Sequence, residues 1–113
     1  IFWSRDKVFQ NDNFYILGAG SNLLIRDKGF NGVIIKLGKG FNNINIIEDK
    51  LVVGAGVFDV NLSNFALKNN IAGFEFYSGI PGLVGGAIKM NAGCFGSETK
   101  DILESVENMM LKM

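Results

Sequence analysis

The sequence has 113 residues, enough for one small domain, and 48% of them are hydrophobic, which predicts a packed core rather than a disordered chain. Lys and Arg together number 11, as do Asp and Glu, so no basic bias indicates a nucleic-acid or membrane-surface partner. Histidine is absent and Cys94 is the only cysteine, which argues against a metal site, excludes an internal disulfide and fits a reducing compartment. No apolar run approaches the ~20 residues of a membrane span.

The first part of the chain predicts short strands separated by turns. We expect residues 1–13 to be the end of a helix followed by a polar turn. Runs of β-branched, aromatic and aliphatic residues predict strands over 14–17 and 33–37, and a further strand-like segment over 23–25. Glycine and asparagine at 18–22 and 26–32 predict the turns between them.

The middle of the chain predicts a hairpin and then a helix. Two apolar runs, 45–48 and 51–53, flank Asp49 and Lys50 in the pattern of a β-hairpin. Residues 59–70 predict a helix that begins with Asp59 as the N-cap and ends at two asparagines. Its core-facing stripe at helical spacing comprises Phe58, Leu62, Phe65 and Ala66. Near the end of the chain, residues 101–107 predict a helical turn followed by a strand.

Residues 73–96, GFEFYSGIPGLVGGAIKMNAGCFG, form a glycine-rich segment that holds 7 of the 15 glycines and the only proline, Pro81. Glycine lets another group approach the backbone closely, whereas proline fixes the backbone angle φ. Ordinary loops are polar, but this segment is rich in aliphatic residues. Two interpretations stay open on these residues alone: backbone that lies against a large ligand, and a buried, tightly turning connection.

Two shorter glycine loops are candidates for anion binding. Loop 18–22, GAGSN, departs from the dinucleotide fingerprint G-x-G-x-x-G, because Leu23 occupies the third glycine position and no helix start follows. Its backbone N–H groups can instead form a concave anion site, and the alternative is a simple turn between strands. Residues 54–56, Gly-Ala-Gly, precede a predicted helix, but Asp59 would repel an anion there, so we favour a tight turn.

Two motifs taken together carry a resemblance to a known family. ILGAGSNLLIRDKGFNGVIIKL at 16–37 and the glycine-rich segment resemble the FAD-binding domain of the UDP-N-acetylenolpyruvoylglucosamine reductases, also called UDP-N-acetylmuramate dehydrogenases. The resemblance covers about residues 14–108. It implies an α+β fold of the vanillyl-alcohol-oxidase (PCMH-type) superfold, with FAD between two small subdomains. Residues 1–113 would then be a partial FAD-binding domain, truncated at both ends, without the C-terminal substrate-binding domain.

The resemblance also implies which residues bind FAD. Loop 18–22 would bind the pyrophosphate through Gly18, Ala19, Gly20, Ser21 and Asn22. The residues that would line the flavin and its ribityl or phosphate portion are Ile80, Pro81, Gly82, Gly85, Gly86, Ala87, Asn91, Ala92 and Gly93.

The reaction implied by the resemblance is the NADPH-dependent reduction of UDP-N-acetylglucosamine enolpyruvate to UDP-N-acetylmuramate, a peptidoglycan precursor made in the cytoplasm. The family's serine or cysteine, glutamate and arginine lie in segments beyond Met113, so we expect no catalytic residue here and an inactive chain on its own. The alternatives are another FAD-dependent oxidoreductase of the same superfold and a non-catalytic fragment. Loss of a flanking domain would also leave apolar surface exposed.

Overall fold

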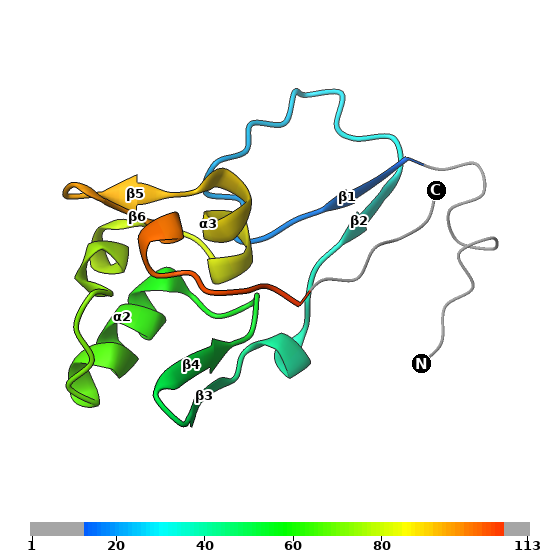
Figure 1. Cartoon of the computed structure of the whole chain (residues 1–113). Helices are drawn as coiled ribbons and strands as arrows, with labels where there is room; N and C mark the ends of the chain where they lie inside the picture. The colour runs from blue at the N-terminus through cyan, green and yellow to red at the C-terminus, as the bar shows by residue number, and fades with distance from the viewer. Residues whose placement is uncertain (1–12, 108–113) are drawn as a thin grey trace.

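The computed structural model describes residues 13–107, which form three two-stranded sheets, two α-helices and three short 3₁₀ helices (Figure 1). The sheets are a parallel pair, β1 (Phe14–Ile16) with β2 (Val33–Ile35), and two antiparallel hairpins, β3 (Ile44–Ile47) with β4 (Lys50–Val53) and β5 (Gly93–Cys94) with β6 (Ser97–Glu98). The helices are α2 (Asp59–Lys68), α3 (Val84–Met90), η1 (Lys39–Phe41), η2 (Glu75–Gly79) and η3 (Thr99–Asp101). The mixed α+β character expected from the sequence is confirmed.

The parallel pair β1–β2 holds the two ends of a long connection, residues 17–32, that arches away from the helices (Figure 1). Gly32 allows this pairing, because a Cβ there would lie 2.2 Å from the Asn13 carbonyl oxygen. The strand-like segment expected over 23–25 is wrong: these residues belong to no strand, and the Leu24 side chain is 93% exposed. The sheet of β1 and β2 has only these two strands, and residues 23–25 lie in the connection without pairing to either of them.

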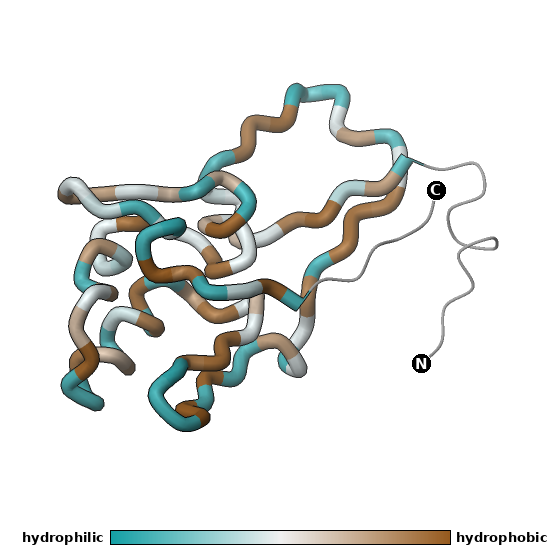
Figure 2. Tube along the Cα trace, in the orientation of Figure 1, coloured by the Kyte–Doolittle hydropathy of each residue, from teal (hydrophilic) through white to brown (hydrophobic). Residues whose placement is uncertain are grey.

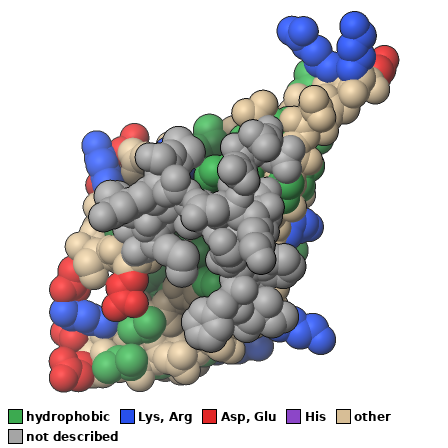
Figure 3. Space-filling view, turned by 90° about the vertical axis from the view of Figure 1, so that its right-hand side faces the viewer, with side chains coloured by type: hydrophobic (Ala, Val, Ile, Leu, Met, Phe, Trp, Pro, Cys, Tyr) green, Lys and Arg blue, Asp and Glu red, His purple; other side chains and the backbone are tan. Residues whose placement is uncertain are grey.

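Hydrophobic residues are frequent along the strands of this region (Figure 2), and several large ones are exposed. Ile16 in β1 and Ile34 in β2 are about half exposed, as are Ile47 and Val52 in the hairpin. Figure 3 shows basic side chains, with an acidic one beside them, at the outer tip of the connection, and apolar side chains on other parts of the same face. These exposed side chains agree with the sequence-based expectation of exposed apolar surface, and its origin in the loss of a flanking domain stays a prediction.

The predicted hairpin is present, with its turn one residue earlier than expected. Ile44 pairs with Val53 and Ile47 with Lys50, so Lys50 is the first residue of β4 and the turn consists of Glu48 and Asp49. Glu48 adopts a left-handed conformation (φ 58°), a region that non-glycine residues seldom occupy. Without glycine in the link, the turn position could not be read from residue type.

The core lies where α2 packs against η2 and α3. Its buried side chains are Val57, Leu62, Phe76, Tyr77, Val84 and Ala87. The rings of Phe76 and Tyr77 stack with centroids 4.5 Å apart. The buried Tyr77 hydroxyl lies 3.0 Å from the Thr99 hydroxyl, which donates to the Ala92 carbonyl oxygen. This hydrogen-bonded pair connects η2 to η3 across the end of α3.

Helix α2 differs from the sequence-based expectation at its first turn. Phe58 is the N-cap residue and Asp59 is the first helical residue, whose side chain makes no capping hydrogen bond. Leu62 and Ala66 are buried as predicted, but the Phe58 side chain is 49% exposed. Phe58 is extended and forms an isolated antiparallel bridge with Leu83, which takes it out of the helical stripe. The helix ends at Lys68 with Asn69 as C-cap, close to the predicted end.

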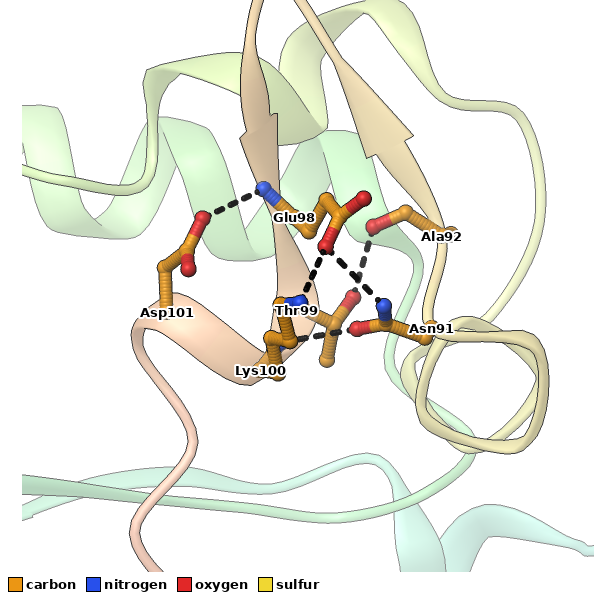
Figure 4. A network of polar contacts seen from close by, with 6 residues as sticks. All are labelled: Asn91, Ala92, Glu98, Thr99, Lys100 and Asp101. Atoms are coloured by element: carbon orange, nitrogen blue, oxygen red, sulfur yellow. Dashed lines mark hydrogen bonds and ion pairs between the residues drawn. The ribbon is translucent and has the colours of Figure 1, made fainter.

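The glycine-rich segment is a folded unit rather than a loop, since it contains η2, α3 and β5. A polar network fixes its end to η3 (Figure 4). The Asn91 amide donates to Glu98 Oε2 at 3.2 Å, and Asn91 Oδ1 accepts from the Lys100 backbone N–H at 2.9 Å. Glu98 and Asp101 form a capping box on η3. The helical turn predicted over 101–107 thus occurs at 99–101, whereas the predicted strand is absent from 103–107.

The helix tail predicted for residues 1–13 lies outside the described residues except for Asn13. None of the helices in the described part of the chain is both long enough and apolar enough to cross a membrane.

Candidate functional site

Loop 18–22 lies against the glycine-rich segment, although about sixty residues separate them in the sequence. The Ser21 hydroxyl donates to the Pro81 carbonyl oxygen at 3.3 Å. The Asn22 amide contacts Met90 Sδ at 2.8 Å, at the far end of α3. Gly18 faces Leu83, whose side chain would lie 3.6 Å from a Cβ at position 18. The two motifs that the sequence singled out therefore form one surface.

This surface offers backbone donors. No backbone N–H group of loop 18–22 donates to an acceptor among the described residues, and the same holds for Gly82, Leu83 and Gly86. Gly20 has φ 78° and open space around its Cα, in keeping with a glycine turn that presents backbone to solvent. Exposed N–H groups that point out of a turn are suited to bind phosphate oxygens without a basic side chain.

Gly82 holds the junction of the two motifs. Its φ of 119° is disfavoured for a side-chain-bearing residue, and a Cβ there would lie 2.9 Å from Ser21 Oγ. The Asp59 carboxyl also approaches this glycine, with Oδ2 3.9 Å from the same Cβ position. The Gly82 carbonyl oxygen accepts the Asp59 backbone N–H at 3.0 Å. Asp59, Gly82 and Ser21 thus form one cluster.

The Asp59 carboxyl is an unusual feature of this cluster. The residue is 1% exposed, and its Oδ1 atom is buried without a hydrogen-bond partner. Burial raises the pKa of Asp59 from the ordinary 3.8 to about 6. The sequence predicted Asp59 as a helix N-cap that would repel an anion, and gave no indication that it is buried. The sequence offered only a weak signal of this burial, namely that apolar residues flank Asp59 at Val57, Phe58 and Val60.

The other predicted site residues divide into exposed and structural ones. Gly86 is exposed on α3, and no atom lies within 4 Å of its Cβ position. Gly85, by contrast, packs against Ala55, 3.1 Å from the Cβ position. The residues that belong mainly to the packing behind the surface are Ile80 and Ala87 in or against the core, Asn91 and Ala92 in the polar network, and Gly93 in β5. Ala19 is exposed in loop 18–22.

Two further features, the turn at residues 54–56 and a surface hollow, were also considered as binding sites. Residues 54–56 form the tight turn expected from the sequence, since the Val57 backbone N–H donates to the Gly54 carbonyl oxygen at 3.1 Å. The Gly54 and Gly56 N–H groups donate to the Asn43 and Phe41 carbonyl oxygens. An open hollow of about 420 Å³ lies beside the β5–β6 hairpin, next to Cys94 and Glu98. No group of three or more acidic or cysteine side chains suited to a metal occurs in the described part of the chain.

Comparison with known proteins decides the family. The family described as "FAD binding domain" matches residues 8–112. The chain therefore belongs to the FAD binding domain family. It is 53% identical to the UDP-N-acetylenolpyruvoylglucosamine reductase of Pelagibacter ubique (strain HTCC1062) over 102 residues, which cover 89% of this chain and 34% of that protein.

Proteins of the same name from other bacteria are similarly related. That of Rickettsia akari (strain Hartford) is 53% identical over 90 residues, covering 80% of this chain and 30% of that protein. That of Orientia tsutsugamushi (strain Ikeda) is 50% identical over 101 residues, covering 86% and 33%. The chain thus spans about a third of the length of these relatives.

The residues at the junction fit the cofactor of an FAD binding domain. FAD carries a pyrophosphate that needs hydrogen-bond donors, and loop 18–22 presents N–H groups without protein acceptors. FAD also has a broad, flat flavin that needs backbone without side chains, and the space above Gly86 is free of protein atoms. Gly86 is exposed and helical, so the fold itself does not require glycine there.

Proposed function

We propose that this chain is the FAD-binding portion of a UDP-N-acetylenolpyruvoylglucosamine reductase, which uses NADPH to reduce UDP-N-acetylglucosamine enolpyruvate to UDP-N-acetylmuramate. The observation that carries the proposal is the junction of loop 18–22 with the glycine-rich segment, in a chain of the FAD binding domain family. Identity of 50% or more to reductases of that name supports this family member over other FAD-dependent oxidoreductases. The product is a peptidoglycan precursor, and we place the reaction in the cytoplasm.

In this proposal the chain holds the cofactor and the cofactor performs the redox chemistry. FAD supplies hydride transfer when bound. The backbone N–H groups of loop 18–22 bind the pyrophosphate, which fits their lack of protein acceptors. The Ser21 hydroxyl donates to the Pro81 carbonyl oxygen in the free chain and would turn from it to donate to the pyrophosphate. Gly82 and Gly86 provide side-chain-free backbone for the ribityl and flavin portions. Ile80, Ala87, Asn91 and Ala92 support this surface from behind, through the core and the polar network of Figure 4.

In this proposal, cofactor binding and substrate chemistry belong to different parts of the longer protein. Residues 1–113 correspond to part of the FAD-binding domain, and we place substrate binding and proton donation in the two thirds of the relatives' length that this chain does not cover. The described residues hold no ion pair or metal cluster at the junction that suggests a reaction centre. We therefore expect the 113-residue chain to bind FAD without catalysing NADPH oxidation that depends on the enolpyruvyl substrate.

A pair of glycine substitutions separates cofactor binding from folding. Gly86→Ala places a methyl group in space that is free of protein atoms and removes a helical glycine, so it should leave the fold intact or stabilise it by up to about 1 kcal/mol. Because the methyl group would occupy the surface assigned to FAD, we expect at least a tenfold weaker FAD affinity. Quenching of flavin fluorescence on titration with the chain measures that affinity.

Gly40→Ala is the matched control. Gly40 lies in η1, has no protein atom within 4 Å of its Cβ position and does not have a positive φ. The control should bind FAD like the unmodified chain. If Gly86→Ala also binds FAD with unchanged affinity, the flavin does not lie over α3. A chain that binds no FAD at all would instead support the non-catalytic alternative.

A further inference from the structure

Asp59 is the one buried acidic group among residues 13–107, it lies beside the junction, and the cofactor assignment above gives it no role. It is 1% exposed on α2, and its backbone N–H donates to the Gly82 carbonyl oxygen at 3.0 Å. Asp59 Oδ2 and Ser21 Oγ lie 3.9 Å and 2.9 Å from the same point, the Cβ position of Gly82. The carboxyl and the hydroxyl are therefore less than 7 Å apart, with one glycine between them.

The surroundings of Asp59 favour its neutral form. Its Oδ1 atom has no hydrogen-bond partner, and Asp59 takes part in neither ion pair of the described residues. An ionised carboxylate buried without a donor or cation is strongly disfavoured. The titratable group that faces it is Tyr77 on η2, whose pKa is raised by burial and, to a smaller extent, by the charge of Asp59. A neutral tyrosine offers no charge to offset a carboxylate.

The pyrophosphate of FAD would add two negative charges on the Ser21 side of this cluster. Like charges close together raise the pKa of an acid, and the partly buried setting screens them less than bulk water does. A neutral Asp59 does not repel the pyrophosphate, whereas an ionised one does. Binding of the anion and binding of a proton by Asp59 must then favour each other equally, by thermodynamic linkage.

We propose that FAD binding at the junction of loop 18–22 with Gly82 increases the protonated fraction of the buried Asp59 carboxyl, with the proton taken from solvent, so that Asp59 is a positioning residue whose protonation modulates the cofactor affinity. The proposal rests on the assignment of the FAD pyrophosphate to loop 18–22. In the free chain Asp59 changes protonation near pH 6. In the complex the change moves to higher pH, so FAD affinity falls as the pH rises between these values.

The experiment measures the FAD dissociation constant of the 113-residue chain at roughly pH 5.5, 6.5, 7.2 and 8. If FAD raises the pKa of Asp59 by about one unit, linkage predicts a dissociation constant roughly five to ten times larger at the highest pH than at the lowest. Calorimetry near pH 6.5 in two buffers of different ionisation enthalpy should then show uptake of roughly half a proton per FAD bound. The pyrophosphate diester itself does not titrate in this range.

Asp59→Asn and Asp49→Asn identify the group responsible. Asp59→Asn should bind FAD with a dissociation constant that changes less than twofold over the range. Asp49→Asn, in the exposed turn between β3 and β4, should follow the unmodified chain. The proposal is overturned if the unmodified chain binds FAD with equal affinity at all four pH values, or if Asp59→Asn keeps the full pH dependence. Failure to bind FAD at any pH would overturn the cofactor assignment as well, so the two failures are distinguishable.

Discussion

Asp59→Asn should change how the stability of the free chain depends on pH. The pKa of Asp59 rises from 3.8 to about 6 because the folded chain buries it. The folded state therefore keeps its proton up to about pH 6, whereas the unfolded state releases it near 3.8. Between these values the unfolded state binds fewer protons, so the free energy of unfolding falls as the pH rises. At about 1.4 kcal/mol per pKa unit, the total loss is about 3 kcal/mol, and it is complete above about pH 7.

Urea unfolding at pH 4, 5, 6 and 7.5, followed by circular dichroism, measures this effect. The unmodified chain should lose about 2.4 kcal/mol more between pH 4 and pH 7.5 than Asp59→Asn does, because part of the total loss has already occurred at pH 4. The difference between the two chains matters, because the other acids titrate in both. Burying the asparagine amide has a cost that does not depend on pH. This cost therefore drops out when the free energies of unfolding of one chain are compared between two pH values. Equal pH profiles for the two chains would refute the argument that Asp59 is buried and lacks a partner in the folded state.

Two further predictions concern the packing behind the junction. Gly54→Ala should destabilise the chain by about 3 kcal/mol or more, because the Cβ would lie 2.1 Å from the Phe41 carbonyl oxygen and backbone must move on both sides; an unchanged urea midpoint would contradict this close approach. Tyr77→Phe should cost about 1 kcal/mol, since it removes a buried hydrogen bond while Thr99 keeps its carbonyl acceptor. Thermal melting should then show a decrease of several degrees, and an unchanged melting temperature would argue against this hydrogen bond.

The sequence allows prediction of the elements whose patterns are local. The β3–β4 hairpin and helix α2 follow from apolar periodicity and polar turns, and both are present within one or two residues of the predicted bounds. Glycine patterns also indicated that loop 18–22 and the glycine-rich segment are special, and the structure brings these two motifs together. The family resemblance, based on the same motifs, is confirmed by the match to residues 8–112.

The features that could not be predicted depend on distant partners. Helix α3 contains Gly85 and Gly86, which lower helix propensity, yet it forms because Val84 and Ala87 are buried against α2 and η2. Phe58 continues the helical stripe in sequence, but its bridge with Leu83 removes it from the helix. The burial of Asp59 likewise follows from the position of Gly82, which lies 23 residues later in the chain.

The contact between Ser21 and Pro81 closes a loop of sixty residues, yet it consists of one exposed hydrogen bond from the Ser21 hydroxyl to the Pro81 backbone carbonyl oxygen. Closing so long a loop carries an entropic cost of several kcal/mol, and exposed hydrogen bonds of about 1 kcal/mol each do not offset it alone. The 17–32 connection should therefore dock after the α2–η2–α3 core has formed and detach from it without global unfolding. A ligand that contacts both sides of the junction would contribute the free energy needed to close this loop. Ligand binding and ordering of the 17–32 connection would then occur together. Hydrogen-exchange protection of residues 18–22 should therefore rise with ligand concentration.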